Sequence, residues 1–285
     1  MDKPFVRIII WLGIMAVLTL MAMGIWYIVC GGAQTTESLK WLQLLQTFGT
    51  FLLPPILGAW WWSNNHKPFQ WLKLNVGMDG RVVILAIAIM LCAIPAINLL
   101  ADLNGRIQLP KSLDFIEQIL RSQEDAATKL TEMFLQADNV GVLLINIVLL
   151  ALLPALSEEL TFRGTLQQIL SRNQHLAIWL SAIIFSAVHL QFYGFIPRML
   201  MGAMFGYVFV WTSSLWVPIL MHFTNNGIAV ISYYLFDEIA DNKTWADTIG
   251  TGNMWWLGII SILATIALLG LIYSLTKKQK NHEIV

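Results

Sequence analysis

Long apolar runs alternate with shorter polar segments along the chain. Each run reaches or approaches the roughly 20 apolar residues that a helix needs to cross a bilayer core. The pattern therefore predicts a bundle of about eight transmembrane helices, of which the fifth and sixth are short enough to be buried among the others. The runs cover residues 8–29, 41–62, 82–101, 140–154 with a continuation, 176–190, 195–212, 215–236 and 254–275.

Composition strengthens this interpretation. Of the 285 residues, 57% are hydrophobic and only 12% are charged, whereas a soluble domain carries roughly 25% charged residues. Lipid must therefore cover much of the surface, and we expect one all-α integral membrane domain over residues 1–285 with a polar cavity inside the membrane. The formal net charge of zero gives no electrostatic reason to expect a nucleic-acid partner.

Lys and Arg concentrate in alternate connections between the runs, whereas Asp and Glu dominate the connection at 237–247. Cytoplasmic segments of membrane proteins are enriched in Lys and Arg, so the pattern predicts that both termini are cytoplasmic. The run 8–29 exceeds the roughly 7–15 apolar residues of a signal peptide, and we expect it to remain as the first span. The Lys and Arg residues in the segments assigned to the cytoplasm are Lys3, Arg7, Lys67, Lys73, Arg81, Arg163, Arg172, Lys277, Lys278 and Lys280.

The longest connection, residues 102–139, is polar and charged but contains apolar residues at helical spacing. That spacing favours amphipathic helices that lie on the outer membrane face or cap the bundle. The alternative is a solvated loop packed on the bundle. The apolar residues concerned are Leu113, Ile116, Ile119, Leu120, Leu130, Met133 and Phe134.

Two adjacent carboxylates, Glu158 and Glu159, directly follow the apolar run that begins at residue 140. An ionisable side chain inside the bilayer costs about 2.5–3.5 kcal/mol even on a lenient scale, so such groups tend to face a cavity or a partner. Glu159 and Arg163 are four residues apart and can form an ion pair on one helix face. Glu158 lies roughly 100° around the helix and is free to point elsewhere. The alternative is that both carboxylates merely end a helix at the interface.

Two histidines and an asparagine occur on later runs. His189 lies near the end of the run 176–190, while His222 and Asn226 lie one turn apart on the run 215–236. A tight turn at 173–174 would place Glu158 and His189 at similar distances from it, about 23 Å along each helix. A lone intramembrane histidine is usually a packing residue, but this set together favours a site that opens toward the cytoplasm.

Such a set suits hydrolysis. A carboxylate in an apolar cavity can act as a general base on water, and His and Asn can orient that water and donate to an oxyanion. A second hypothesis is a zinc site made by Glu158, His189 and His222 with an open position for water. The His-Glu-x-x-His motif of common zinc proteases is absent from the sequence. A covalent mechanism is disfavoured because no Ser or Cys has an evident basic partner.

The order of these site residues along the chain resembles the motif order of the CPBP family. This family comprises the CAAX proteases and bacteriocin-processing enzymes and is also called the Abi family. Any one of the motifs is weak evidence, whereas all three in order on successive apolar runs are a strong signal. The resemblance implies an intramembrane endopeptidase whose catalytic core occupies residues 140–235. The motifs are Glu158-Glu159-x-x-x-Arg163, Phe185-x-x-x-His189 and His222-x-x-x-Asn226.

The resemblance also implies a role for each motif residue. Glu158 would activate the attacking water, and Asn226 would stabilise the oxyanion. His189 and His222 would position that water or bind zinc, and Arg163 would hold the second carboxylate of the pair. The family has been described both as metalloproteases and as metal-independent glutamate peptidases, and the sequence leaves this choice open.

Two other functions remain as alternatives. One is a family member that acts without proteolysis, as an immunity factor or a scaffold for membrane partners. The other is a transporter with a proton-relay set of Glu and His, which the lack of an internal repeat disfavours. The leading hypothesis is an endopeptidase that cuts a membrane-associated peptide or protein, expected in the inner membrane of a bacterium.

Overall fold

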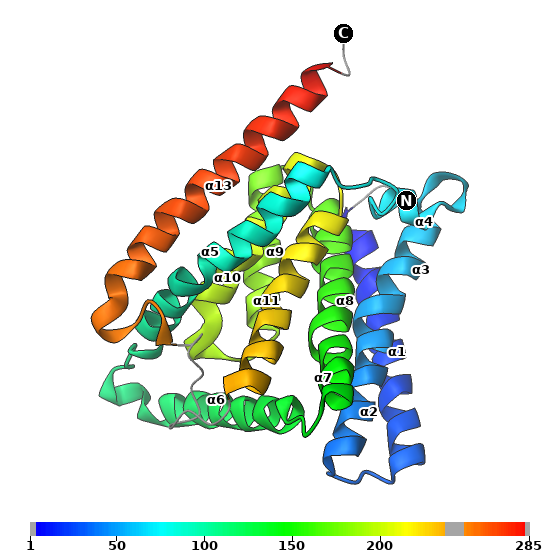
Figure 1. Ribbon diagram of the computed structural model, residues 1–285. Helices are drawn as coiled ribbons and strands as arrows, with labels where there is room; N and C mark the ends of the chain where they lie inside the picture. Colours follow the sequence, from blue (N-terminus) through cyan, green and yellow to red (C-terminus); the bar gives the residue numbers. More distant parts are fainter. Residues whose placement is uncertain (1–3, 237–247, 283–285) are drawn as a thin grey trace.

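The computed structural model describes residues 4–236 and 248–282, and every regular element in these two ranges is a helix. The acidic connection expected at 237–247 and Lys3 lie outside the described residues. Figure 1 shows the helices side by side as a bundle. The elements before residue 140 are α1 (Pro4–Cys30), α2 (Thr36–Gln46), η1 (Thr47–Leu52), α3 (Leu53–Trp62), η2 (Asn64–His66), α4 (Pro68–Trp71), α5 (Gly80–Gly105), η3 (Lys111–Leu113) and α6 (Asp114–Leu135).

The second half of the bundle carries the predicted motifs. Each of the eight apolar runs corresponds to a helix or a continuous set of helical segments among the described residues. The elements are α7 (Val140–Asn146), η4 (Ile147–Leu152), α8 (Leu153–Thr161), η5 (Phe162–Gln167), α9 (Gln174–Ala187), η6 (Phe192–Gly194), α10 (Phe195–Thr212), α11 (Trp216–Phe236), η7 (Gly252–Met254) and α13 (Trp255–His282).

Six of these segments are long and apolar enough to cross a membrane, counted over the described residues. This confirms an all-α, multi-pass membrane protein. Two predicted spans fall outside the six. The apolar helix α9 is shorter, and α11 carries the polar residues His222 and Asn226. The six are Pro4–Cys30, Thr36–Trp62, Gly80–Gly105, Val140–Gln167, Phe192–Thr212 and Gly252–Lys278.

The span Val140–Gln167 is one continuous helix with two π-helical segments, η4 and η5, on either side of α8. Pro154, in the first turn of α8, has no N–H to donate. A π-helical segment such as η4, which directly precedes α8, lets the backbone bypass this missing hydrogen bond. π-helical segments often occur at functional sites. The helix then reaches a turn, as predicted, where the Asn173 side chain caps α9 by accepting a hydrogen bond from the Leu176 N–H at 3.2 Å.

Helix α6 lies across one end of the bundle, and α1 begins and α13 ends at the opposite end (Figure 1). Helix α6 contacts α2, α7, α11 and the segment η6. Phe134 is buried in these contacts, whereas Phe115 and Ile116 in the first half of α6 are exposed. The connection 102–139 therefore contains one amphipathic helix that caps the bundle, and the alternative of a plain solvated loop is wrong.

Candidate active site

One carboxylate oxygen joins helices α8 and α11. Glu159 Oε1 accepts a hydrogen bond of 2.7 Å from Arg163 Nη1, the ion pair that the helical spacing predicts. The same oxygen lies 2.8 Å from His222 Nδ1. Because an ionised carboxylate only accepts hydrogen bonds, the Nδ1 nitrogen carries the proton in this contact. The side chains of Arg163, Glu159 and His222 are 1%, 0% and 5% exposed, so together they form a buried polar chain.

Aromatic rings and a glycine close the space around this chain. The Arg163 guanidinium lies 4.7 Å from the centre of the Phe185 ring and 5.4 Å from that of Phe205. Its Nη2 atom donates to the Gly202 carbonyl at 2.9 Å. The His222 ring packs at a right angle to Phe185. A Cβ atom at Gly202 would lie only 3.1 Å from Arg163 Nη2, so the close approach of α10 favours glycine there.

Glu158 lies beside the buried chain rather than in it. Its Oε2 atom is 3.8 Å from His222 Nε2, which is beyond normal hydrogen-bond length. Its side chain is 18% exposed, against 0% for that of Glu159. Arg163 and His189 both lie within electrostatic range of it. The two adjacent carboxylates thus have different environments, one committed to a buried ion pair and the other partly accessible.

His189 lies beyond the end of the helix that precedes it. Helix α9 ends at Ala187, so the predicted span 176–190 was too long at this end. The following turn places Leu190 at a left-handed φ of 55°. His189 Nδ1 is 2.8 Å from the Phe185 carbonyl oxygen. Since a carbonyl only accepts, Nδ1 is the protonated nitrogen, and Nε2 is left for another partner.

A cavity of about 480 Å³ opens beside His189 and Asn226. Helices α2, α6 and α11 and the span Val140–Gln167 supply its mainly apolar walls, with Gln43, Gln46 and Thr131 among the polar lining residues. Asn226 Nδ2 is 3.5 Å from the Leu150 carbonyl oxygen, a long contact that leaves the amide able to donate elsewhere. Two of the predicted site residues therefore face the same cavity.

A second group of polar residues connects α6 to the His189 turn, and it is missing from the sequence prediction. Glu124 Oε1 accepts from Gln191 Nε2 at 3.3 Å, and Glu124 Oε2 accepts from the Tyr193 N–H at 3.2 Å. Arg198 Nη2 donates to Gln191 Oε1 at 2.8 Å. The isolated charge of Arg198 within an apolar run was the available sequence signal for this group.

The predicted zinc ligands do not form a metal site. Among residues 4–236 and 248–282, no group of three or more His, Cys, Asp or Glu side chains is placed to hold a metal ion. His222 Nδ1 is already bonded to Glu159, and His189 Nδ1 to a backbone carbonyl. These two bonds leave the Nε2 atom of each ring as the nitrogen available to a further partner.

Comparison with known proteins places the site within a matched region. Residues 140–228 match the family model described as type II CAAX prenyl endopeptidase Rce1-like. The chain is also 34% identical over 87 residues to the uncharacterized protein YpbD of Bacillus subtilis (strain 168), which covers 29% of this chain. The chain spans 43% of that relative, less than half of its length. No solved structure matches the chain.

The matched region contains all six predicted site residues, which lie on the span Val140–Gln167, in the turn after α9 and on α11. The resemblance inferred from the three motifs is thereby confirmed. Residues 140–228 are thus similar to the CAAX protease family, also called CPBP.

Proposed function

We propose that the protein is an intramembrane endopeptidase that hydrolyses a peptide bond in a membrane-associated peptide or protein. The family match supports a protease in general terms. The single observation that carries the proposal is the contrast between the two adjacent carboxylates. Glu159 is held by Arg163 and His222, while Glu158 is partly exposed and lies 3.8 Å from His222 Nε2. A carboxylate that is not tied up in an ion pair can serve as a general base.

In the proposed reaction Glu158 takes a proton from a water molecule, and the resulting hydroxide attacks the peptide carbonyl carbon. The His189 Nε2 atom can accept a hydrogen bond from that water, since its Nδ1 is bonded to a backbone carbonyl. The Asn226 amide donates to the oxyanion. The proton on Glu158 then passes to the leaving nitrogen, which releases a carboxylic acid and an amine.

In this scheme the His222 ring lies between the two carboxylates and is held in one orientation. Glu159 and Arg163 fix its ring from one side, so Nε2 faces the side of Glu158. A histidine held in one orientation loses little conformational freedom in the transition state, and misplacement of reacting groups by about 1 Å can cost roughly 100-fold in rate. We therefore propose that Arg163 and Glu159 position His222 and do not touch the substrate.

The lining of the cavity beside His189 and Asn226 favours a substrate with apolar side chains. Its apolar walls suit bulky apolar side chains, and Gln43 and Gln46 can bond the extended backbone of a bound peptide. The start of α1, with Arg7, and the end of α13, with Lys277 and Lys278, lie at the same end of the bundle (Figure 1). By the enrichment of cations on the cytoplasmic side, we propose that both termini are cytoplasmic and that the membrane is a bacterial inner membrane.

The test is cleavage of a quenched peptide library by the purified full-length protein in detergent. We expect wild type to cut and His222→Ala to be silent. His175→Ala removes an exposed histidine that bonds Tyr207 and serves as the matched control, with activity near wild type. Each protein is assayed with and without chelator, and activity that survives chelation supports the metal-free mechanism. Equal cleavage by all three folded proteins would contradict the catalytic assignment, and inactivity of all three would favour the scaffold function.

A further inference from the structure

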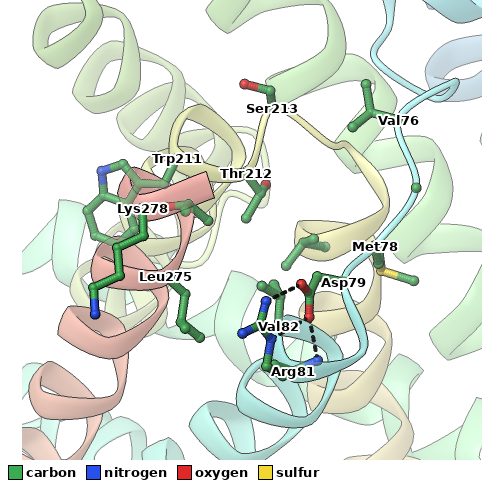
Figure 2. A pocket seen from close by; sticks show the side chains of 13 residues that line it. Val76, Met78, Asp79, Arg81, Val82, Trp211, Thr212, Ser213, Leu275 and Lys278 are labelled. Carbon is green, nitrogen blue, oxygen red and sulfur yellow. Dashed lines mark hydrogen bonds and ion pairs between the residues drawn. The ribbon is translucent and has the colours of Figure 1, made fainter. Parts of the chain in front are cut away.

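A second cavity lies at the end of the bundle opposite α6 and away from the candidate active site. Its volume is about 700 Å³. The segment before α5, the turn between α10 and α11, and the end of α13 form its walls (Figures 1 and 2). Segments far apart in sequence thus meet around one opening.

The charges in this cavity favour an anion. Arg81 and Lys278 are basic and Asp79 is acidic, so two positive charges and one negative charge leave a net charge of +1 among the lining residues. Asp79 is bonded to Arg81 Nε at 3.1 Å and to Arg81 Nη2 at 2.8 Å. The Nη1 donors of Arg81 are not used in this pair. In Figure 2 the Arg81–Asp79 pair lies on one side of the cavity, and Lys278 lies with Trp211 on another.

The start of α5 adds to this preference. Asp79 caps the helix, since its side chain accepts from the Arg81 N–H at 2.8 Å and its carbonyl accepts from the Val83 N–H at 3.0 Å. The N–H groups of Gly80 and Val82 in the first turn have no partner within the helix. The N-terminus of a helix attracts phosphate through these groups and the helix dipole. Helix α5 has 26 residues, so the dipole at this end is fully developed.

Aromatic residues place the cavity at the level of the lipid headgroups. Trp211 packs against Tyr273 at 5.4 Å and Tyr207 at 5.8 Å between ring centres, and Lys277 lies over the Tyr273 ring. Trp and Tyr gather with Lys and Arg at membrane interfaces. Val82 and Leu275 supply an apolar wall to the same cavity, which suits the start of an acyl chain.

We propose that this cavity binds the phosphate group of an anionic phospholipid, with Arg81 and Lys278 as its charged contacts. Basic pockets between membrane helices on the cytoplasmic side are suited to anionic headgroups. Free phosphate shares the chemistry of the headgroup, but the aromatic and apolar surroundings favour the lipid. Because α13 supplies Lys278, a bound headgroup would also tie the end of this helix to α5. The site is separate from the proposed peptidase reaction.

The experiment uses native mass spectrometry of the detergent-purified full-length protein, titrated with phosphatidylglycerol, phosphatidylcholine or inorganic phosphate. Wild type is expected to retain phosphatidylglycerol in preference to phosphatidylcholine. Arg81→Gln/Lys278→Gln should bind it roughly 30-fold more weakly, in line with the loss of two cations near a lipid headgroup at about 1 kcal/mol each. Lys278→Gln alone keeps the Arg81–Asp79 ion pair and should show an intermediate loss.

The matched control is Lys111→Gln/Lys129→Gln, which removes two exposed cations near α6 at the other end of the bundle. It should bind phosphatidylglycerol as wild type does. Equal binding of phosphatidylglycerol by all variants would overturn the site. Equal retention of both lipids, or binding of inorganic phosphate as tight as that of the lipid, would overturn the assignment to an anionic lipid.

Discussion

His222 on α11 contacts Glu159 on α8 through a distance of 2.8 Å between Nδ1 and Oε1. This contact joins two helices through residues that are 63 positions apart in sequence. It occurs on the same carboxylate oxygen that binds Arg163. The buried ion pair and the candidate catalytic residues are therefore one unit, in which a change to either part affects both stability and activity.

Arg163→Met should strongly destabilise the protein, because it leaves the Glu159 carboxylate buried without its cation. Removal of one partner of a buried pair costs about 3–5 kcal/mol. The double variant Glu159→Leu/Arg163→Met should recover part of this loss, since no uncompensated charge then remains. Reversible unfolding in mixed detergent micelles measures the free energies of unfolding.

The matched control for that variant is Arg106→Met. Arg106 forms an ion pair with Asp102 at the same spacing of four residues, but its side chain is 67% exposed. An exposed pair contributes at most about 1 kcal/mol, so Arg106→Met should be close to wild type. A loss as large as that of Arg163→Met would show that burial does not set the strength of the pair.

Gly202→Ala should destabilise the packing of α10 against the site. The added Cβ would lie 3.1 Å from both Arg163 Nη2 and Phe185 Cδ1, and 3.3 Å from the Ala182 Cα. Overpacking of this kind costs about 1–3 kcal/mol. Gly24→Ala in α1 is the control, because a Cβ there meets nothing within 4 Å. Thermal unfolding of both variants should show a lower midpoint for Gly202→Ala only.

Glu124→Ala should disturb the turn that carries His189. It removes the acceptor of both Gln191 Nε2 and the Tyr193 N–H, so residues 188–193 should exchange their amide hydrogens faster. We expect cleavage to slow by about 10- to 100-fold through misplacement of His189, with the fall in kcat rather than KM. Asp125→Ala, an exposed neighbour on α6, should change neither measurement. Unchanged exchange in Glu124→Ala would mean that α6 does not hold the turn.

The start of α6 should loosen in acid. Glu117 bonds the Arg121 side chain and the Leu109 N–H, and these hydrogen bonds lower the pKa of its carboxyl from the ordinary value of 4.5. A carboxyl whose pKa is lower in the folded state stabilises that state above the ordinary value and loses this effect as the pH falls below it. The difference in melting temperature between wild type and Glu117→Gln should therefore be present at pH 7 and shrink below pH ~4.5. A constant difference would contradict this account.

The apolar pattern predicted the helical membrane fold because a bilayer imposes length and hydropathy on each span. The Glu159–Arg163 pair and the turn at Asn173 were also predictable, since both depend on local helical spacing and capping. The link from Glu159 to His222 was not, because spacing within one helix carries no information on which helix lies opposite. The His189 turn was missed for another reason, as it contains Leu190 at a positive φ that leucine rarely adopts.

The most direct test of the central claim compares Glu158→Gln with Glu37→Gln. Glutamine keeps the size of the side chain but cannot take a proton from water at neutral pH, and Glu37 is an exposed carboxylate at the start of α2. Initial rates are measured on the best peptide from the library, with circular dichroism to confirm that both variants are folded. The account predicts that Glu37→Gln cuts like wild type and that Glu158→Gln falls at least ~100-fold, the lower range for loss of a general base. A folded Glu158→Gln that cuts at the wild-type rate would contradict the account.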